Sequence, residues 1–162
     1  MSVNLEKLLA LHAECERRGI KYGLGAKAPA MAATPAQIAR IDCSGYVRWL
    51  LWQASGGALK LPDGSQNQRD WCEKNLREVG SYRDAAQYMT GKRLFIAFIR
   101  PGYNGCGPVG HVWLLLDGDP GMGVTAETVE SYGGHGPGSR PWNARTLMRE
   151  VYSVFELPVS EK

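Results

Sequence analysis

The run RLFIAFI at residues 93–99 is the clearest indication of how this chain folds. It is short and almost entirely apolar, and it is rich in the β-branched and aromatic side chains that favour extended backbone. Three runs of similar character follow at Gly110–Asp117, Val124–Tyr132 and Val151–Leu157, each bounded by Gly, Pro or Asp. The second part of the chain is therefore predicted to form short β-strands.

A turn signal links two of these runs. Asp117–Gly121 has the sequence DGDPG, which is typical of the turn in an antiparallel hairpin. Before Gly91 the apolar residues recur at helical spacing instead. Helices followed by strands, without βαβ alternation, predict an α+β fold whose N-terminal helical part packs on a C-terminal antiparallel β-sheet.

Helices are predicted where a capping residue precedes apolar residues at helical spacing. The predicted segments are residues 4–18 with Gly19 as the stop, a short helix from the capping box Thr34–Gln37, residues 43 to about 54 capped by Asp42, residues 65 to about 75 with Ser65 and Gln68 as capping box, and a turn around 84–90.

Composition narrows the possible function classes. The 162 residues are 44% hydrophobic and 22% charged, without a repeat or linker, which predicts one globular domain over residues 1–162. The net charge of +3 and the scattered Lys and Arg residues argue against a nucleic-acid partner. The longest apolar runs are far shorter than the ~20 residues of a membrane span. The N-terminal segment lacks a secretory signal, which predicts synthesis in the cytoplasm.

Cys43 is the first candidate for chemistry. The four cysteines form no C-x-x-C pair, so free thiols are expected. If a helix begins at Cys43, its free N–H groups and its dipole stabilise a thiolate there. Gly45, in the same turn, would let a substrate or another chain segment approach closely. An inert buried side chain is the alternative interpretation for such a cysteine.

His111 and Glu130 could complete a catalytic arrangement. A nucleophilic cysteine needs a base, and His111 enters a predicted strand from which its ring can point to one side. Glu130 shares a strand face with Thr128, and from a neighbouring strand it could orient the imidazole. The alternative interpretation of His111 is a polar residue whose hydrogen bonds are simply satisfied, and that of Glu130 is a surface carboxylate. His12 is predicted to be solvated on the first helix, and His135 to lie in a mobile loop over residues 133–138.

The order of these residues resembles the NlpC/P60 family of papain-like cell-wall cysteine peptidases. The resemblance rests on YGLG at 22–25, DCSGYV at 42–47, LP at 61–62 followed by SQNQ at 65–68, and GHV at 110–112. These segments lie in the family's order, from Tyr22 to about Tyr132. The chain departs from the family in lacking the Trp and second Gly of Tyr-x-Trp-Gly-Gly. It also has a longer span before Cys43, and a glutamate at the third catalytic position.

The resemblance implies a papain-like fold and hydrolysis of an amide bond in peptidoglycan stem peptides, with the γ-D-glutamyl–diamino acid bond as the family preference. It implies Cys43 as nucleophile, His111 as general base and Glu130 as the orienting residue, with Tyr22, Asp42 and Ser44 at the substrate. No metal or organic cofactor is expected. Action in the cell wall or periplasm would then require export, phage lysis or delivery by a secretion machine, and an immunity protein is an open question.

Three alternatives stay open. The first is an acyltransferase on a related cysteine fold, and the second is a non-catalytic cell-wall binding module. The third is a zinc site drawn from Cys43, Cys106, His111 and His135. Gly105–Gly110 matches the dinucleotide pattern G-x-G-x-x-G, but it leads into a predicted strand instead of opening a helix, which argues against a nucleotide site.

Overall fold

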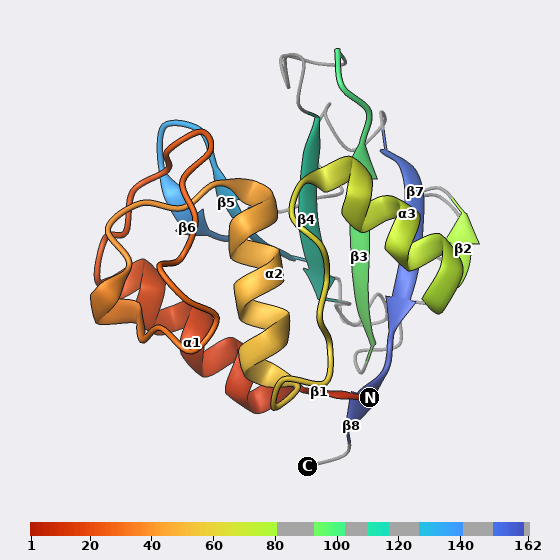
Figure 1. Ribbon diagram of the computed structural model, residues 1–162, viewed down its shortest axis with the longest axis horizontal. Coiled ribbons are helices and arrows are strands. Elements are labelled where there is room, and N and C mark those ends of the chain that lie inside the picture. The colour runs from red at the N-terminus through yellow and green to blue at the C-terminus, as the bar shows by residue number, and fades with distance from the viewer. Residues whose placement is uncertain (81–92, 103–109, 117–126, 141–150, 161–162) are drawn as a thin grey trace.

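The computed structural model describes residues 1–80, 93–102, 110–116, 127–140 and 151–160 (Figure 1). Its elements, in chain order, are β1 (Val3–Asn4), α1 (Leu5–Arg17), the 3-10 turn η1 (Pro35–Gln37), α2 (Cys43–Ala54), α3 (Ser65–Asn75), β2 (Arg77–Gly80), β3 (Leu94–Ile99), β4 (His111–Leu116), β5 (Glu127–Tyr132), β6 (Gly136–Gly138), β7 (Val151–Leu157) and β8 (Val159–Ser160).

Among the described residues, six strands form one antiparallel sheet in the order β2-β7-β3-β4-β5-β6. The late strand β7 lies between β2 and β3, so a segment distant in the chain joins these two earlier strands into one sheet. A short parallel pair, β1 with β8, joins the two ends of the chain. The predicted α+β class, with helices first and an antiparallel sheet after them, is confirmed.

Helix α2 packs against strands β4 and β5 of the sheet (Figure 1). Val47 and Leu50 of this helix belong to one buried cluster with Val112 and Leu114 of β4 and Val129 of β5. All five side chains are fully buried, and each such burial contributes roughly 1.5–3 kcal/mol. This packing fixes the start of α2 relative to the start of β4.

The predicted helix boundaries are close to those observed. Asn4 caps α1 by accepting the Lys7 N–H at 3.0 Å, and Gly19 follows the helix with φ of 65°. The capping box at Thr34 is present, but it opens only a single 3-10 turn. The capping box assigned to Ser65 is wrong, because Gly64 occupies the cap position of α3.

The glycine-rich segment 133–138, predicted to be a mobile loop, is a loop only in part, because residues 133–135 form an exposed turn. Residues 136–138 are buried and form β6, which pairs with the end of β5. Gly136 has φ of 105°, and a Cβ there would collide with the carbonyl oxygen of Ile20. Gly136 therefore lets β6 lie close to the backbone that follows α1. The predicted turns at 84–90 and 117–121, and the first residues of the predicted strand 124–132, lie outside the described residues.

No helix in the described part of the chain is long and apolar enough to cross a membrane.

Candidate active site

Cys43 is the first residue of α2, as predicted. Asp42 caps the helix by accepting the Gly45 N–H on Oδ1 at 2.7 Å. Ser131 of β5 donates to the carbonyl oxygen of Ile41 at 2.8 Å, so the start of α2 is tied to the sheet. The N–H groups of the first helical turn have no preceding helical carbonyl to bind, and Cys43, the first residue of that turn, is only 5% exposed.

His111 is the first residue of β4, where Gly110 turns the chain into the strand. Gly110 has φ of 70°, and a Cβ there would collide with the backbone of β3. In the register between β4 and β5, Leu115 lies opposite Thr128. His111 and Glu130 are each an even number of residues from this pair, so their side chains share one face of the sheet.

The structure brings Cys43, His111 and Glu130 together. His111 Nε2 and Glu130 Oε1 are hydrogen-bonded at 2.8 Å, and His111 is also hydrogen-bonded to Cys43. Because Nε2 bonds the carboxylate, Nδ1 is the ring nitrogen left for the thiol. Burial lowers the pKa of His111, but its hydrogen bonds and charge interactions with Cys43 and Glu130 outweigh this and raise that pKa to about 9. His111 is therefore a positively charged imidazolium at neutral pH.

Glu130 is fully buried and remains ionised. Burial raises its pKa, but the hydrogen bond and charge of His111, the charge of Arg140 and the hydroxyl of Thr128 together lower it below 4.5. Thr128 donates to Oε2, and Arg140 donates through Nε to Oε2 at 3.0 Å and through Nη2 to Oε1. The predicted shared face of Glu130 and Thr128 is confirmed.

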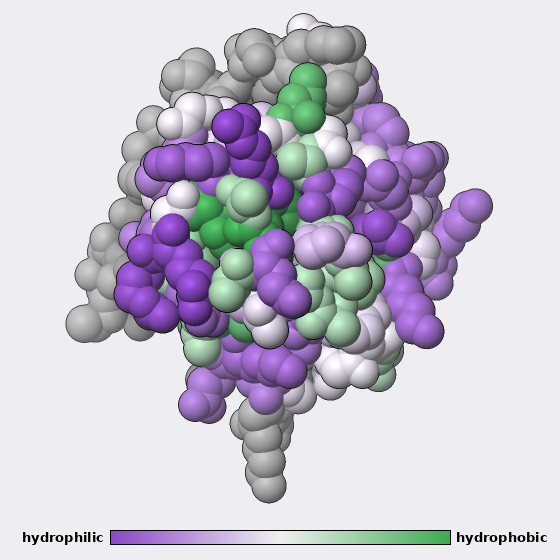
Figure 2. All heavy atoms as spheres, turned by 60° about the vertical axis from the view of Figure 1, so that its left-hand side comes forward, coloured by the Kyte–Doolittle hydropathy of each residue, from purple (hydrophilic) through white to green (hydrophobic). Residues whose placement is uncertain are grey.

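Tyr22, Asp42 and Ser44 line a cavity of about 240 Å³ together with Cys43. The cavity wall also includes Leu24, whose side chain is among the few large exposed apolar ones in the described residues. On the face that Figure 2 shows, hydrophilic side chains surround a smaller hydrophobic area. The wall of the cavity beside Cys43 itself combines polar side chains with the apolar side chain of Leu24.

Lys27 places a positive charge in this cavity. Its Nζ donates to Asp42 Oδ2 at 2.6 Å, to Ser44 Oγ at 3.1 Å and to Asp63 Oδ1 at 3.0 Å. Burial lowers the pKa of Lys27, but the hydrogen bonds and charges of the two carboxylates raise it overall. Asp42 therefore has two roles, since it caps α2 and also binds the ammonium group.

Gly45 makes room for the chain itself. A Cβ at this position would lie 2.8 Å from Asp42 Oδ1 and 2.9 Å from Lys27 Cδ. Of the two expectations for Gly45, close approach of another chain segment is the one that the geometry shows.

Sequence reasoning missed Lys27, Arg140 and Gln68. Gln68 is fully buried and donates to the carbonyl oxygens of Ser44 and Pro62, so α3 helps to hold the start of α2. The signal at Gln68 was assigned to a capping box instead. Lys27 lies within the long span before Cys43, and Arg140 follows β6. No local pattern marks either residue.

His12 is buried, so the prediction that it is solvated is wrong. It lies with Leu8 and Cys15 on the buried side of α1 and is 6% exposed. Its ring nitrogens are hydrogen-bonded to Tyr46 Oη at 2.6 Å and to Ser139 Oγ at 2.9 Å. Burial lowers the pKa of His12 to about 4, although the charge of Glu130 opposes this.

The candidate zinc ligands that the structure describes do not form a metal site. The described residues contain no group of three or more His, Cys, Asp or Glu side chains that could hold a metal ion. His111 is hydrogen-bonded to Cys43 and Glu130, and His135 stacks on Tyr132 with ring centroids 4.8 Å apart. Cys106 lies outside the described residues.

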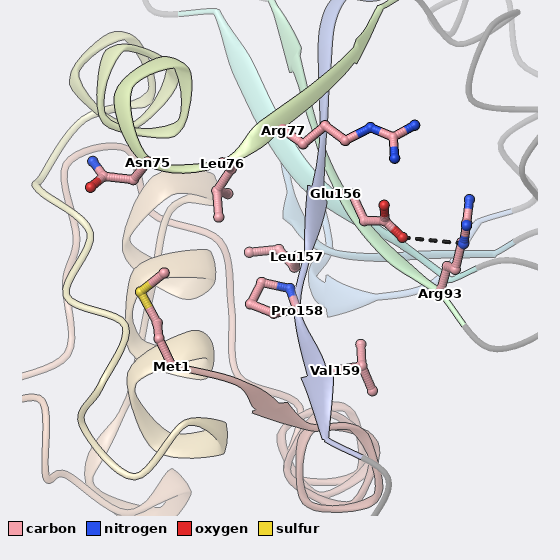
Figure 3. Close-up of a pocket in the computed structure, with 9 residues that line it drawn as sticks. All are labelled: Met1, Asn75, Leu76, Arg77, Arg93, Glu156, Leu157, Pro158 and Val159. Atoms are coloured by element: carbon pink, nitrogen blue, oxygen red, sulfur yellow. Dashed lines mark ion pairs between the residues drawn. The ribbon is translucent and has the colours of Figure 1, made fainter.

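A larger cavity of about 420 Å³ lies elsewhere (Figure 3). It is lined by the ends of β7 and α3 and contains the ion pair Arg93 Nε–Glu156 Oε2 at 3.2 Å. Arg93 precedes β3, whereas His111 pairs with the last residue of that strand, Ile99. This cavity is therefore at the opposite end of the sheet from the candidate site.

No protein-family model and no curated protein matches the chain.

Proposed function

We propose that this protein is a cysteine peptidase or amidase that hydrolyses an amide bond in peptidoglycan stem peptides. The observation that carries the proposal is the hydrogen-bonded series of Cys43, His111 and Glu130. A thiol at a helix start, a protonated imidazole beside it and a buried carboxylate behind that imidazole are what nucleophilic catalysis by cysteine requires. A papain-like fold is part of the same proposal.

The choice of substrate rests on the sequence resemblance to the NlpC/P60 family at residues 22–25, 42–47 and 110–112. The cavity beside Cys43 is compatible with it, because a stem peptide carries amides, charged groups and small apolar side chains. In this proposal Tyr22, Asp42 and Ser44 contact the acyl part of the substrate, and Lys27 adds a positive charge to the same wall.

In the proposed reaction the thiol proton of Cys43 is already on His111 Nδ1, so the nucleophile is a thiolate beside an imidazolium. The thiolate sulfur then forms a bond to the carbonyl carbon, and the resulting oxyanion accepts hydrogen bonds from the backbone N–H of Cys43 and the hydroxyl of Tyr22. When the carbon–nitrogen bond breaks, His111 donates its proton to the leaving amine. The products of this step are a thioester on Cys43 and a free amine.

Deacylation repeats this chemistry with water. Neutral His111 removes a proton from the water, and the hydroxide adds to the thioester carbonyl. Breakage of the carbon–sulfur bond releases the carboxylic acid and restores the Cys43–His111 pair. Glu130 holds the imidazole through Nε2 in both steps.

The test is digestion of purified peptidoglycan, with the products identified by mass spectrometry. We expect stem-peptide fragments from the wild type and a loss of at least ~10³-fold in rate for Cys43→Ala. Cys72→Ala is the matched control, because Cys72 is fully buried in α3 and burial raises the pKa of its thiol to about 12. This variant should digest like the wild type.

Intact peptidoglycan with the wild type would contradict the proposal, as would equal digestion by Cys43→Ala. An added amine separates hydrolysis from acyl transfer. Fragments that end in a carboxylic acid indicate a hydrolase, whereas fragments joined to the amine indicate an acyltransferase.

A further inference from the structure

Arg140 contacts both oxygens of the Glu130 carboxylate. Its Nε donates to Oε2 at 3.0 Å and its Nη2 donates to Oε1. Oε1 is also bonded to His111 and Oε2 to the hydroxyl of Thr128. Two neighbouring N–H groups that bind one carboxylate fix its plane as well as its charge. The direction of Glu130 toward His111 is therefore set partly by Arg140.

Arg140 is itself held in place by its surroundings. Its backbone N–H donates to Thr128 Oγ1 at 2.9 Å, and its carbonyl accepts the Thr128 N–H at 2.9 Å. The guanidinium carbon lies 3.7 Å from the centroid of the Tyr132 ring, on which His135 also stacks. The side chain is only 24% exposed, so this contact differs from an ion pair formed on an open surface.

Among the described residues, the ionisable groups that interact with or lie near Glu130 come from four parts of the fold. They are His12 on α1, Cys43 at the start of α2 beyond the imidazole, His111 on β4, and Arg140 after β6. His12 is neutral at pH 7, because burial lowers its pKa to about 4. At neutral pH the cations that face Glu130 among the described residues are therefore the imidazolium of His111 and the guanidinium of Arg140.

These two cations differ in whether they keep their positive charge during the reaction. In the proposed reaction His111 gives its proton to the leaving amine and is neutral until water is activated. During that interval a fully buried carboxylate would face a neutral ring, and burial favours its protonated form. The guanidinium of Arg140 does not lose its proton, so its charge remains beside Glu130 throughout.

We propose that Arg140 is a positioning residue that keeps Glu130 ionised and aimed at His111 Nε2 while the imidazole loses and regains its proton. The proposal rests on the proposed role of Cys43 as nucleophile and extends it to a residue that acts through Glu130.

The test measures the reactivity of Cys43 without any substrate. The protein is treated with iodoacetamide at pH 4–9, and alkylation of the tryptic peptide Ile41–Arg48 is followed by mass spectrometry. With Arg140→Met, we expect the midpoint of the acid limb to move to higher pH by about one unit or more, because an adjacent arginine lowers the pKa of a carboxyl by ~1–3 units. Arg140→Lys keeps the charge and should move the midpoint by less than half as much.

Arg93→Met is the matched control. Arg93 is also half-buried and paired with a glutamate, but it lies in the cavity at the opposite end of the sheet (Figure 3). Its alkylation profile should superimpose on that of the wild type. A wild-type midpoint in Arg140→Met would overturn the proposal, and so would equal shifts in the Met and Lys variants.

Thr128→Val is the second variant, for use if Arg140→Met does not fold. It removes the hydroxyl hydrogen bond to the same carboxylate and should give a smaller shift in the same direction; an unchanged midpoint in the folded variant would overturn the proposal. Because alkylation uses no peptidoglycan, this result is separable from the digestion experiment. A failed digestion would reject the substrate and leave the role of Arg140 standing or falling on the alkylation profiles.

Discussion

His12 and His111 are two buried histidines whose surroundings have opposite effects. His12 is on the buried side of α1, where its partners are the neutral hydroxyls of Tyr46 in α2 and Ser139 after β6. His111 lies at the start of β4, where its partners are Cys43 and the carboxylate of Glu130. The pKa of His12 is lowered to about 4, whereas that of His111 is raised to about 9.

The difference shows that burial alone does not decide the charge of a histidine. Burial is the largest single cause for both rings, and in both it disfavours the imidazolium. At His111, an anion in direct contact and a thiol that can become one reverse the outcome. At His12 the charge of Glu130 acts without a direct contact and only reduces the effect of burial.

Replacing Glu130 by Gln should have the largest effect, because it removes the anion that distinguishes the two sites. We expect the pKa of His111 to fall by about two units towards that of His12. The free energy of unfolding should fall by about 3 kcal/mol, because Arg140 would be left beside a neutral amide. NMR titration of the three histidines and urea unfolding measure the two effects. A His111 titration still centred near 9 would show that Cys43 alone maintains the proton.

The pH dependence of stability should reveal the opposite signs directly. The unfolded chain protonates His12 below 6.5 but the folded chain only below about 4, so stability decreases as pH falls through this window. The full effect of His12 is about 3 kcal/mol. The contribution of His111 is complete below pH 6.5 and is lost as pH rises through about 9.

His12→Gln is the variant that isolates the acid side. Urea unfolding at pH 7 and pH 4.5 should show a smaller loss of stability for this variant than for the wild type, while the alkaline loss remains. Equal losses in the two proteins between these pH values would contradict the assignment to His12.

Tyr46→Phe should have the smallest effect of the three. It removes the hydroxyl that binds His12 Nδ1 at 2.6 Å and leaves the packing of the ring on Trp49 in place. Loss of this buried hydrogen bond should lower the free energy of unfolding by about 1–2 kcal/mol, measured by urea unfolding at pH 7. The titration of His111 should not change. A shift in that titration would show that the two histidine sites are coupled through α2.

Local signals in the sequence were sufficient for much of the fold. Capping residues, glycine stops and runs of β-branched residues act within a few positions, so the three α-helices and the strands β3, β4 and β7 were predicted to within one or two residues. The same local patterns indicated Cys43, His111 and Glu130 as candidate site residues. Their proximity could be proposed only from the order of the motifs.

The local chemistry of the site was thus present in the sequence: a cysteine in a first helical turn, a histidine entering a strand, and a glutamate on a strand face. The tertiary structure alone decided which charges surround these groups. Lys27 and Arg140 reach the site from a loop and from beyond β6, and His12 is neutral because β6 and α2 cover it. Burial and long-range charge depend on segments that meet only in the folded chain, whereas helix capping and strand propensity depend on neighbouring residues.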